Sequence, residues 1–346
     1  STSRRNSHKE VSQMKTTYQE LETTMEEKLI NLGIESDIAR RCSVNLAEST
    51  LEGVPSHGIN RFPRLVSMIK NGTVKPHEKA KCIESHHAFE IWDGNLGIGI
   101  INAEDAMSRA VELSKGFGIG CVSMRNTNHW MRGGAFGIQA AKNGCVGICW
   151  TTTNPNMPAW GAKDQRIGNN PLVMCVPYKD SFVLVDAAMA QFSYGAIDNA
   201  INDGKCLPVP GGYDEEGKLT SNPCEINKTK RVLPIGFWKG SSFSILMEMI
   251  VTCLSLGKPI CQIAKQGGKA TDEYNLSQIF IAINVEHSSE SNELIQQIKA
   301  FIKSSEPAEG VNEIFIPGEL LSQRKKKNQE QGIEVNDKVW AEIQAI

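Results

Sequence analysis

Apolar positions in the first part of the chain repeat with a helical period. Residues 16–32 and 35–51 place apolar side chains three or four positions apart, with a break at Gly33 and with Ser36 available as an N-cap. The stretch RFPRLVSMIKNG, residues 61–72, has the same period and ends at a glycine. The pattern therefore predicts three N-terminal helices.

Further along the chain, short apolar and β-branched runs alternate with helical segments. The runs predict strands at 88–94, 120–125 and 145–153, with helices between them at 102–118 and 133–144. Such alternation predicts an α/β fold in which helices cover a sheet. Strands at 171–177 and 181–187 follow with too little sequence between them for a crossover helix, so the sheet is predicted to be mixed.

The last third of the chain repeats these patterns after an interruption. Glycine and proline mark an excursion at 205–230. Beyond it the pattern predicts a strongly apolar helix at 241–257, a strand at 278–285, a helix at 291–305, a last strand NEIFIPG at 312–318 and C-terminal helices. We expect the helices of the two chain ends, 16–71 and 319–346, to pack together.

These patterns predict a discontinuous organisation. Residues 1–13 are polar and precede a natural-looking start at Met14, so we interpret them as a tag or a disordered extension. Residues 14–85 plus 319–346 are predicted to form a helical domain. Residues 86–318 are predicted to form the α/β region that binds cofactor and substrate.

Composition and charge exclude several classes of partner. Lys+Arg 37 against Asp+Glu 39 gives a net charge of -2, which argues against nucleic acid and against an anionic membrane surface. The single basic run, 324–327, is typical of a solvated helix face. No apolar run has membrane-spanning length. Ten scattered cysteines without a C-x-x-C pair predict a reducing compartment, which favours the cytoplasm.

A glycine pair before the helix at 102–118 resembles a dinucleotide fingerprint but fails two requirements. Gly97 and Gly99 follow a strand, but Asn102 stands where a third glycine is needed for close helix packing. The next strand ends without the Asp or Glu that holds a ribose. We therefore expect a simple turn with a cap at Asn102.

A phosphate loop and a metal site are also disfavoured. QGGKATDE, residues 266–273, has the Gly-Lys pair of a P-loop but lacks its first glycine and its hydroxyl residue, so we expect a surface loop. His86 and His87 are adjacent and cannot face one ion from a strand, and Cys145 with Cys149 lack a second ligand pair. We predict no metal.

One histidine stands apart from the apolar patterns. In EGVPSHGINRFPR, residues 52–64, His57 lies on a predicted turn between small residues, and Arg61 follows four positions later. An imidazole titrates near neutral pH, and an arginine clamps a carboxylate through two hydrogen bonds. Taken alone, the stretch fits a surface or capping histidine as well as a catalytic one.

Four further stretches carry polar groups suited to ligands. RNTNHWMRGGAFG, residues 125–137, follows a strand and opens a helix at two glycines beside Arg132, an arrangement that favours phosphate or carboxylate. Residues 150–171 form a long polar loop between strands. Asp186 ends a strand among small residues, which lets a flat ligand approach the backbone. Trp238 and Lys239 precede a predicted helix start.

Six of these motifs together resemble a known enzyme family. SHGINRFPR, NHWMRGGAFG, GICWT, PAWGAKDQRIGNNPL, FSYG and GFWKGSS occur in the order found in the malate/L-lactate dehydrogenase family, which lacks the classical Rossmann fold. The likeness runs from about Met14 to the C-terminus.

The resemblance implies a homodimeric cytoplasmic oxidoreductase with a non-Rossmann NAD-binding domain. It implies NADH as cofactor, with NADPH possible, and a small keto acid as substrate. His57 would donate the proton, and Arg61, His129 and Arg132 would contact the substrate. The residues carried over as cofactor contacts are Phe182, Val183, Leu184, Val185, Asp186, Ala187, Ala188, Trp238, Lys239, Pro317, Gly318 and Glu319.

Two departures from the family pattern bear on the substrate. Ala190 replaces a serine found after the cofactor strand in many members, which removes one hydrogen bond. HWMRGG replaces the common HFG or HYG, and this variant favours 2,3-diketo-L-gulonate over malate, lactate or ureidoglycolate and predicts an extra cation beside the substrate. Another 2-keto or cyclic imino acid is the nearest alternative. A non-catalytic nucleotide-binding protein and a cysteine hydrolase are more distant ones.

Overall fold

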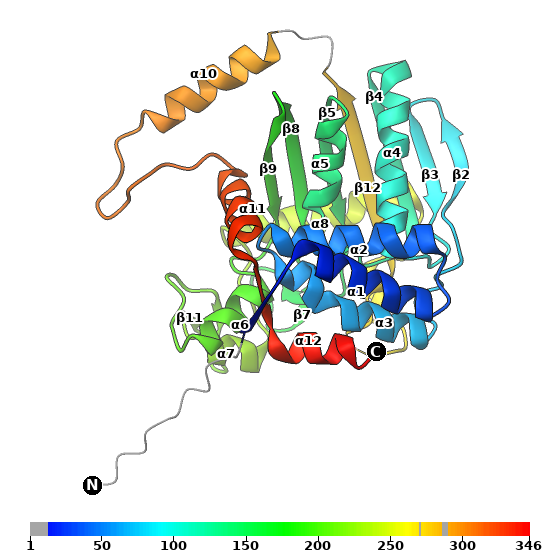
Figure 1. Cartoon of the computed structure of the whole chain (residues 1–346). Coiled ribbons are helices and arrows are strands. Elements are labelled where there is room, and N and C mark those ends of the chain that lie inside the picture. The colour runs from blue at the N-terminus through cyan, green and yellow to red at the C-terminus, as the bar shows by residue number, and fades with distance from the viewer. Residues whose placement is uncertain (1–12, 270, 286–289) are drawn as a thin grey trace.

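A seven-stranded mixed sheet forms the centre of the computed structural model, which describes residues 13–269, 271–285 and 290–346 (Figure 1). Only β3 and β4 are parallel neighbours; every other adjacent pair is antiparallel. The predicted mixed α/β fold is confirmed, including the antiparallel pair at 171–187. The strands in spatial order are β2 (Lys81–His86), β3 (Phe89–Asp93), β4 (Ile119–Asn128), β12 (Tyr274–Asn284), β5 (Cys145–Thr151), β8 (Leu172–Tyr178) and β9 (Ser181–Ala187).

Helices cover both faces of this sheet. On one face α4 (Gly99–Phe117) and α5 (Gly134–Lys142) pack on β4, β5 and β8, and on the other α8 (Trp238–Ser255) packs on β4 and β12. Side-chain alternation along β12 explains the division: Phe280 belongs to the α4–α5 core and Ile279 to the α8 core. Because β12 lies between two core layers, it is largely buried, and residues 279–283 (IFIAI) form a continuous apolar run.

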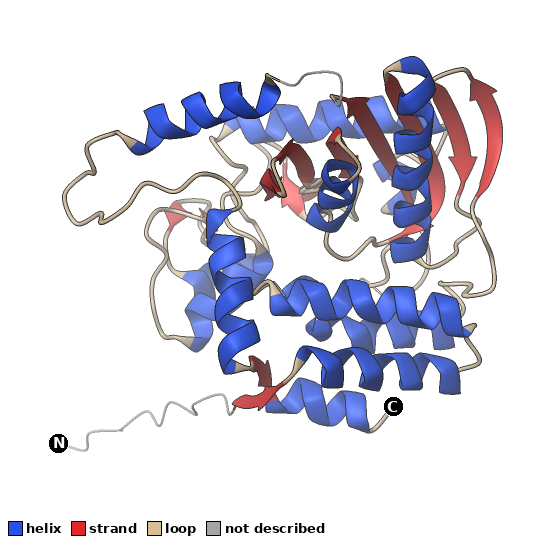
Figure 2. Cartoon of the chain, turned by 45° about the horizontal axis from the view of Figure 1, so that its top comes forward, coloured by secondary structure: helices blue, strands red, loops and turns tan. Residues whose placement is uncertain are grey.

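Helices from both chain ends form one layer below the sheet (Figures 1 and 2). α1 (Tyr18–Asn31), α2 (Ser36–Leu51) and α3 (Phe62–Lys70) share a hydrophobic cluster with Ile333 and Ile343 from the C-terminal end. The short strands β1 (Gln13–Thr16) and β13 (Ile333–Asn336) pair antiparallel, and α11 (Glu319–Gln331) and α12 (Asp337–Gln344) flank β13. A helical part built from both chain ends is thus confirmed.

Smaller elements occupy the rest of the chain. The predicted excursion at 205–230 contains β10 (Gly212–Tyr213), β11 (Leu219–Thr220) and α7 (Pro223–Thr229), and α6 (Tyr194–Asn202) precedes it. The long loop after β5 contains β6 (Met157–Pro158) and β7 (Gln165–Ile167), and α9 (Ile260–Ile263) follows α8. α10 (Ser291–Lys303) stands beside the sheet (Figure 1). Within the described residues, no helix is both long enough and apolar enough to cross a bilayer.

Several local expectations were wrong for identifiable reasons. Residues 312–318 form no strand: the segment passes the edge strand β9, and Pro317 has no N–H to donate there. The N-cap of α2 is Glu35, so Ser36 is already helical. Asn102 caps nothing, because α4 begins at Gly99 and the buried Asn102 amide donates instead to the Gly94 carbonyl and the Thr127 hydroxyl, both at 3.0 Å.

Several short or exposed strands, among them β2 and β13, carried no recognisable sequence signal. β2 is exposed along its whole length and so has no apolar alternation, and it belongs to the sheet although residues 81–85 fall in the predicted helical part. β13 has four residues. Of the predicted N-terminal extension, residues 1–12 lie outside the described residues, and Gln13 opens β1.

Candidate active site

The SHG motif lies on two single-turn 3₁₀ helices between α2 and α3. The first spans Pro55–His57 and the second Ile59–Arg61, with Gly58 between them. The Thr50 hydroxyl on α2 accepts a hydrogen bond from the Ile59 N–H at 2.9 Å, and a Cβ on Gly58 would lie 2.3 Å from that hydroxyl oxygen. The glycine therefore lets this segment pack on α2 and fixes where His57 points.

Arg61 reaches from the same segment to a carboxylate on a distant loop. Its Nε donates to the Ser56 carbonyl at 3.1 Å, and its Nη1 lies 3.4 Å from Glu273 Oε2. The same carboxylate oxygen lies 3.1 Å from Arg64 Nη2. Glu273 is thus shared by two arginines, and its contact with Arg61 is the longer of the two.

His129 completes this cluster from the end of β4. Its ring lies 6.0 Å from the His57 ring, centroid to centroid, in a stacked arrangement. The Met131 N–H donates to His129 Nδ1 at 2.9 Å, so the neutral ring carries its proton on Nε2, which lies 3.8 Å from Glu273. The structure therefore brings together three of the predicted residues, His57, Arg61 and His129.

The cluster holds its histidines neutral. Burial, and secondarily the positive charge of Arg61, lower the pKa of His57 to about 4, although Glu273 opposes this shift. Burial followed by Arg61 and His57 lowers the pKa of His129 well below its usual value. At neutral pH both rings are therefore uncharged, so His57 needs an added negative charge nearby before it can hold a proton to donate.

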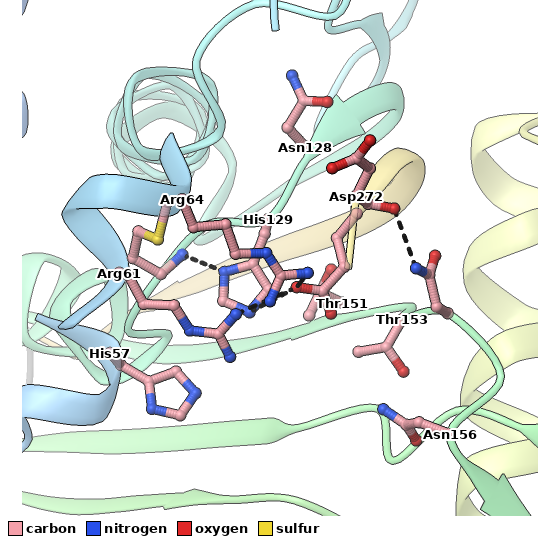
Figure 3. A network of polar contacts seen from close by, with 12 residues as sticks. His57, Arg61, Arg64, Asn128, His129, Thr151, Thr153, Asn156 and Asp272 are labelled. Atoms are coloured by element: carbon pink, nitrogen blue, oxygen red, sulfur yellow. Dashed lines mark hydrogen bonds and ion pairs between the residues drawn. The ribbon is translucent and has the colours of Figure 1, made fainter. Parts of the chain in front are cut away.

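A polar loop links this cluster to the edge of the sheet. Thr153 and Asn156 lie on the segment after β5, and Figure 3 shows them on the opposite side of the view from His57 and Arg61. The side chain of Asn156 accepts from the Asn169 N–H at 2.8 Å, and the Asn169 carbonyl accepts from the Met189 N–H at 2.7 Å. This chain of hydrogen bonds fixes the position of the residues that follow β9.

The backbone after β9 also approaches the histidine directly. A Cβ on Gly195, at the start of α6, would lie 3.3 Å from the Cβ of Ser56, the neighbour of His57. The Ser56 hydroxyl lies 3.1 Å from His57 Nδ1. The start of α6, which follows the edge strand, therefore lies against the residue next to the candidate proton donor.

All three segments predicted to bind the cofactor lie along this edge. The Leu184 N–H donates to the Pro317 carbonyl at 3.3 Å, and the Ile235 N–H donates to the Met189 carbonyl at 2.9 Å, just before Trp238. Gly318 has φ +96, and a Cβ there would lie 3.4 Å from the Leu184 nitrogen, so only glycine suits this close approach.

This edge has the features that a nicotinamide dinucleotide requires. Val185 and Ala187 expose their side chains at the end of β9, and Trp238 presents an aromatic ring that is 58% exposed. Lys239 beside it is an exposed cation at the start of α8. A flat ring on small residues and a phosphate near a lysine are compatible with this surface, so the residues fit the group.

Two acidic residues in the predicted cofactor set have internal partners. The Glu319 carboxylate accepts from the Ile316 N–H at 3.0 Å and pairs with Lys303 at 2.8 Å. The Asp186 carboxylate accepts from the Gly134 N–H at 2.7 Å. The expected anion site at the start of α5 is therefore taken by Asp186, because a helix N-terminus attracts any nearby carboxylate.

The expectation that Arg132 contacts the substrate is not supported by its surroundings. Arg132 is 3% exposed, its guanidinium binds Glu52 at the C-cap of α2, and the charge of Asp186 also acts on it. The neighbouring Trp130 packs against Phe136 and Phe280 in the core. The cation of the HWMRGG variant thus joins α2 to the strand β9 and supplies no charge beside His57.

Sequence reasoning missed Glu273 and Arg64. Glu273 lies in the stretch interpreted as a surface loop, but the antiparallel pairing of Tyr274 with Asn128 brings it beside His129. Only that pairing, which no local pattern reveals, could have found it. The asparagines of the 125–137 motif brace the backbone instead: the Asn128 amide donates to the Gly97 carbonyl at 2.6 Å.

The remaining alternatives gain no support from the geometry. Burial raises the pKa of Cys121 to about 12 and holds that of Cys149 well above its usual value, so neither thiol supplies the thiolate that a cysteine hydrolase needs. Across the described ranges, no group of three or more His, Cys, Asp or Glu side chains is placed to hold a metal ion.

Comparisons with known proteins agree over nearly the whole length. A family model described as malate/L-lactate dehydrogenase matches residues 16–344. Proteins named 2,3-diketo-L-gulonate reductase, from Escherichia coli O127:H6 and from strain K12, are each 43% identical over 336 residues, which is 96% of this chain and 100% of theirs.

Solved structures share the fold. The crystal structure of malate dehydrogenase from Entamoeba histolytica has a TM-score of 0.90 at 25% identity and covers 96% of this chain and 97% of its own. Sulfolactate dehydrogenase from Methanocaldococcus jannaschii has a TM-score of 0.86 at 28% identity, covering 96% of each chain.

Proposed function

Because the chain belongs to the malate/L-lactate dehydrogenase family and is therefore an oxidoreductase, we propose that it reduces 2,3-diketo-L-gulonate to 3-keto-L-gulonate with NADH. The observation that carries the proposal is the stacked pair His57 and His129 beside the guanidinium of Arg61, whose ion pair with Glu273 is long at 3.4 Å. The 43% identity to reductases of that name supports the choice of substrate.

Arg61 provides the carboxylate contact. Its Nη1 is 3.4 Å from Glu273, which is long for an ion pair, so a substrate carboxylate competes well for this guanidinium. Arg64 holds Glu273 at 3.1 Å and so keeps that carboxylate in place when Arg61 turns to the substrate. A carboxylate bound to Arg61 orients the adjacent carbonyl towards the imidazole of His57.

Binding of the substrate prepares His57 to donate. The nearby Arg61 helps to lower the pKa of the free imidazole to about 4. A carboxylate on Arg61 cancels that charge and places a negative charge close to the ring, so the pKa of His57 rises on binding. The protonated ring then donates to the carbonyl oxygen as charge builds on it, a contribution of about a hundred- to ten-thousand-fold.

The edge of the sheet holds the cofactor in this proposal. When bound, NADH supplies the hydride for the keto carbon. Residues Phe182 to Ala188 would line the backbone surface, Trp238 and Lys239 would contact ring and phosphate groups, and Pro317 to Glu319 would close the other side. The fit of these segments to one edge, next to Ser56 and His57, supports this assignment. We favour NADH over NADPH from the family resemblance.

We further propose a cytoplasmic homodimer with a helical part at 14–85 plus 319–346 and an α/β part at 86–318, except that β2 assigns residues 81–85 to the α/β part. All ten cysteines are free, which is compatible with a reducing compartment.

An assay of NADH oxidation against a panel of keto acids tests the proposal. We expect the highest kcat/KM with 2,3-diketo-L-gulonate and lower values with oxaloacetate, pyruvate, cyclic imino acids and the oxidised form of ureidoglycolate. Repeating the panel with NADPH tests the cofactor. A higher value for another acid would replace the substrate but keep the reaction class, and no turnover with any of them would remove the function.

A further inference from the structure

The amphipathic helix α10 is oriented with its apolar side away from the protein. Its apolar residues Leu294, Ile298, Phe301 and Ile302 repeat with a helical period, and their exposed fractions range from 39% to 81%. Figures 1 and 2 both show α10 standing outside the sheet and the helical layer. A helix of a monomeric protein places this side on its own core.

Polar contacts hold α10 in this orientation. The Lys179 N–H donates to Asn292 at 2.8 Å, and the Tyr178 hydroxyl donates to Gln296. The Lys299 ammonium lies 4.5 Å from the centre of the Tyr178 ring, and Lys303 pairs with Glu319. The four α10 residues in these contacts, Asn292, Gln296, Lys299 and Lys303, lie three or four positions apart and so share one side of the helix. The polar side of α10 therefore faces its own chain.

A second apolar surface lies on α8. Its inner side packs on the sheet, and its outer side carries a stripe at helical spacing whose exposed fractions range from 44% to 62%. The stripe consists of Phe243, Leu246, Met249, Ile250 and Leu256, and the exposed Cys253 lies within it. The charged residues of α8 are Lys239 before the stripe and Glu248, which is buried.

We propose that α10 of one protomer packs its apolar side on the α8 stripe of a second copy of this chain, and that the second α10 does the same in return. This inference rests on the proposed homodimer and names its interface. Two different apolar surfaces on one chain satisfy each other in a twofold dimer, because each contact occurs twice.

The available area favours a second copy over a small ligand. The nine apolar side chains are each about half exposed and so offer on the order of 800 Å² per protomer, the size of a stable protein interface. The absence of charge on the α8 stripe matches the apolar side of α10, and both elements are long enough to lie along each other.

The molecular mass of the native protein and of two variants tests this interface. We expect a dimer for the full chain by sedimentation equilibrium. Phe301→Glu on α10 and Leu246→Glu on α8 should each weaken the dimer by about thirty-fold or more, since a charge is then buried at the centre of the contact. Phe117→Glu, a similarly exposed phenylalanine at the end of α4, is the matched control and should leave the dimer intact.

A charge-pair variant distinguishes this pairing from others. Phe301→Lys combined with Leu246→Glu should restore at least part of the affinity lost by each single change, because in the proposed dimer the two opposite charges lie on facing surfaces of different protomers. In parallel, maleimide should label Cys253 more slowly in the native dimer than in Phe301→Glu, while exposed Cys82 on β2 labels equally in both.

The possible outcomes distinguish failure of the α10–α8 contact from failure of the proposed reductase activity. A native monomer, including one that binds phosphatidylcholine vesicles through these surfaces, overturns the inference and the homodimer together. A dimer that survives both glutamate variants, or that only the α8 variant weakens, overturns the α10–α8 contact alone. NADH turnover is measured separately on the native chain, so failure of the proposed reductase activity leaves these results readable.

Discussion

Arg61 and Arg132 are both arginines near the ends of structural elements, and the sequence offered both as contacts for a carboxylate. The structure gives them opposite surroundings. Arg132 is almost wholly buried and binds Glu52, with Asp186 nearby. Arg61 is half-buried and shares Glu273 with Arg64 at 3.4 Å. The comparison shows that an arginine is available to bind a ligand only where its existing ion pair is weak enough to be exchanged.

The contacts around Arg132 connect elements that are distant in the sequence. Its charge is desolvated and paired, so it ties the C-cap of α2 to the segment after β4, and the nearby Gly134 N–H binds Asp186 of β9 at the proposed cofactor edge. The region around Arg61 instead contains His57 and His129, whose pKa values are lowered, and Arg61 itself, which shares Glu273 with Arg64. Such a group of perturbed and charged side chains is typical of functional sites. Changes in the first region should therefore reduce stability, and changes in the second should reduce activity.

His57→Asn gives the largest expected effect on activity. We expect kcat to fall about a hundred- to ten-thousand-fold, because the proton donor is lost, while NADH binding and the unfolding midpoint stay close to native values. Steady-state kinetics and NADH fluorescence measure both. The matched control is His86→Asn on the exposed strand β2, which should keep full turnover. A His57→Asn enzyme with native kcat would remove this residue from the mechanism.

Arg132→Met gives the largest expected effect on stability. The change leaves the Glu52 carboxylate buried without its main partner, so the free energy of unfolding should fall by about 3 kcal/mol. Urea unfolding measures it. Arg40→Met, which removes an exposed arginine paired with Asp37, should change it by less than about 1 kcal/mol. If Arg132→Met instead were stable with a raised KM, Arg132 would be a substrate contact after all.

The neutral state of His57 predicts a stability loss in acid. Its folded pKa of about 4 lies below the ordinary 6.5, so the unfolded state binds the extra proton between these values. Stability is therefore complete above pH 6.5 and falls as the pH drops towards 4, by up to about 3 kcal/mol from this group. Unfolding of His57→Asn at pH 7 and pH 4.5 should show a smaller loss than the native chain.

The exposed His87 supplies the control for this pH experiment. His87→Asn should lose stability in acid as steeply as the native chain does. Equal slopes for the native chain and His57→Asn would show that His57 is not held neutral by the fold.

Arg61→Lys gives the smallest expected effect and tests which arginine binds the carboxylate. Lysine keeps the charge but loses the two-pronged contact, so KM for the keto acid should rise about ten- to a hundred-fold with a smaller change in kcat. Arg64→Lys should raise KM less, because Arg64 is the closer partner of Glu273. The reverse order would assign the carboxylate to Arg64.

Much of the fold could be predicted because its signals are local. The helical period of 16–51, the buried strands and the short link between β8 and β9 predicted the mixed sheet, and six spaced motifs identified the family. The exposed strand β2 and the segment at 312–318 could not be predicted, since strand formation there depends on which neighbour is available to pair.

The site was predictable only where the chain itself brings groups together. His57 and Arg61 are four residues apart on consecutive turns, so their proximity follows from local structure. Glu273 joins them through the pairing of β12 with β4, about 150 residues apart in sequence, and Arg132 turns away because Glu52 on another helix binds it. Neither contact has a local signature.

The central position of β12 has a consequence for biosynthesis. This strand separates β4 from β5, yet the ribosome adds it long after both, about ten to thirty seconds later than β4 at ordinary elongation rates. Until then two apolar strand edges are without their common neighbour, and they are open to wrong partners. Nascent chains of this protein should therefore depend on chaperones until residue 284 has emerged, and a stalled chain ending before Tyr274 should aggregate.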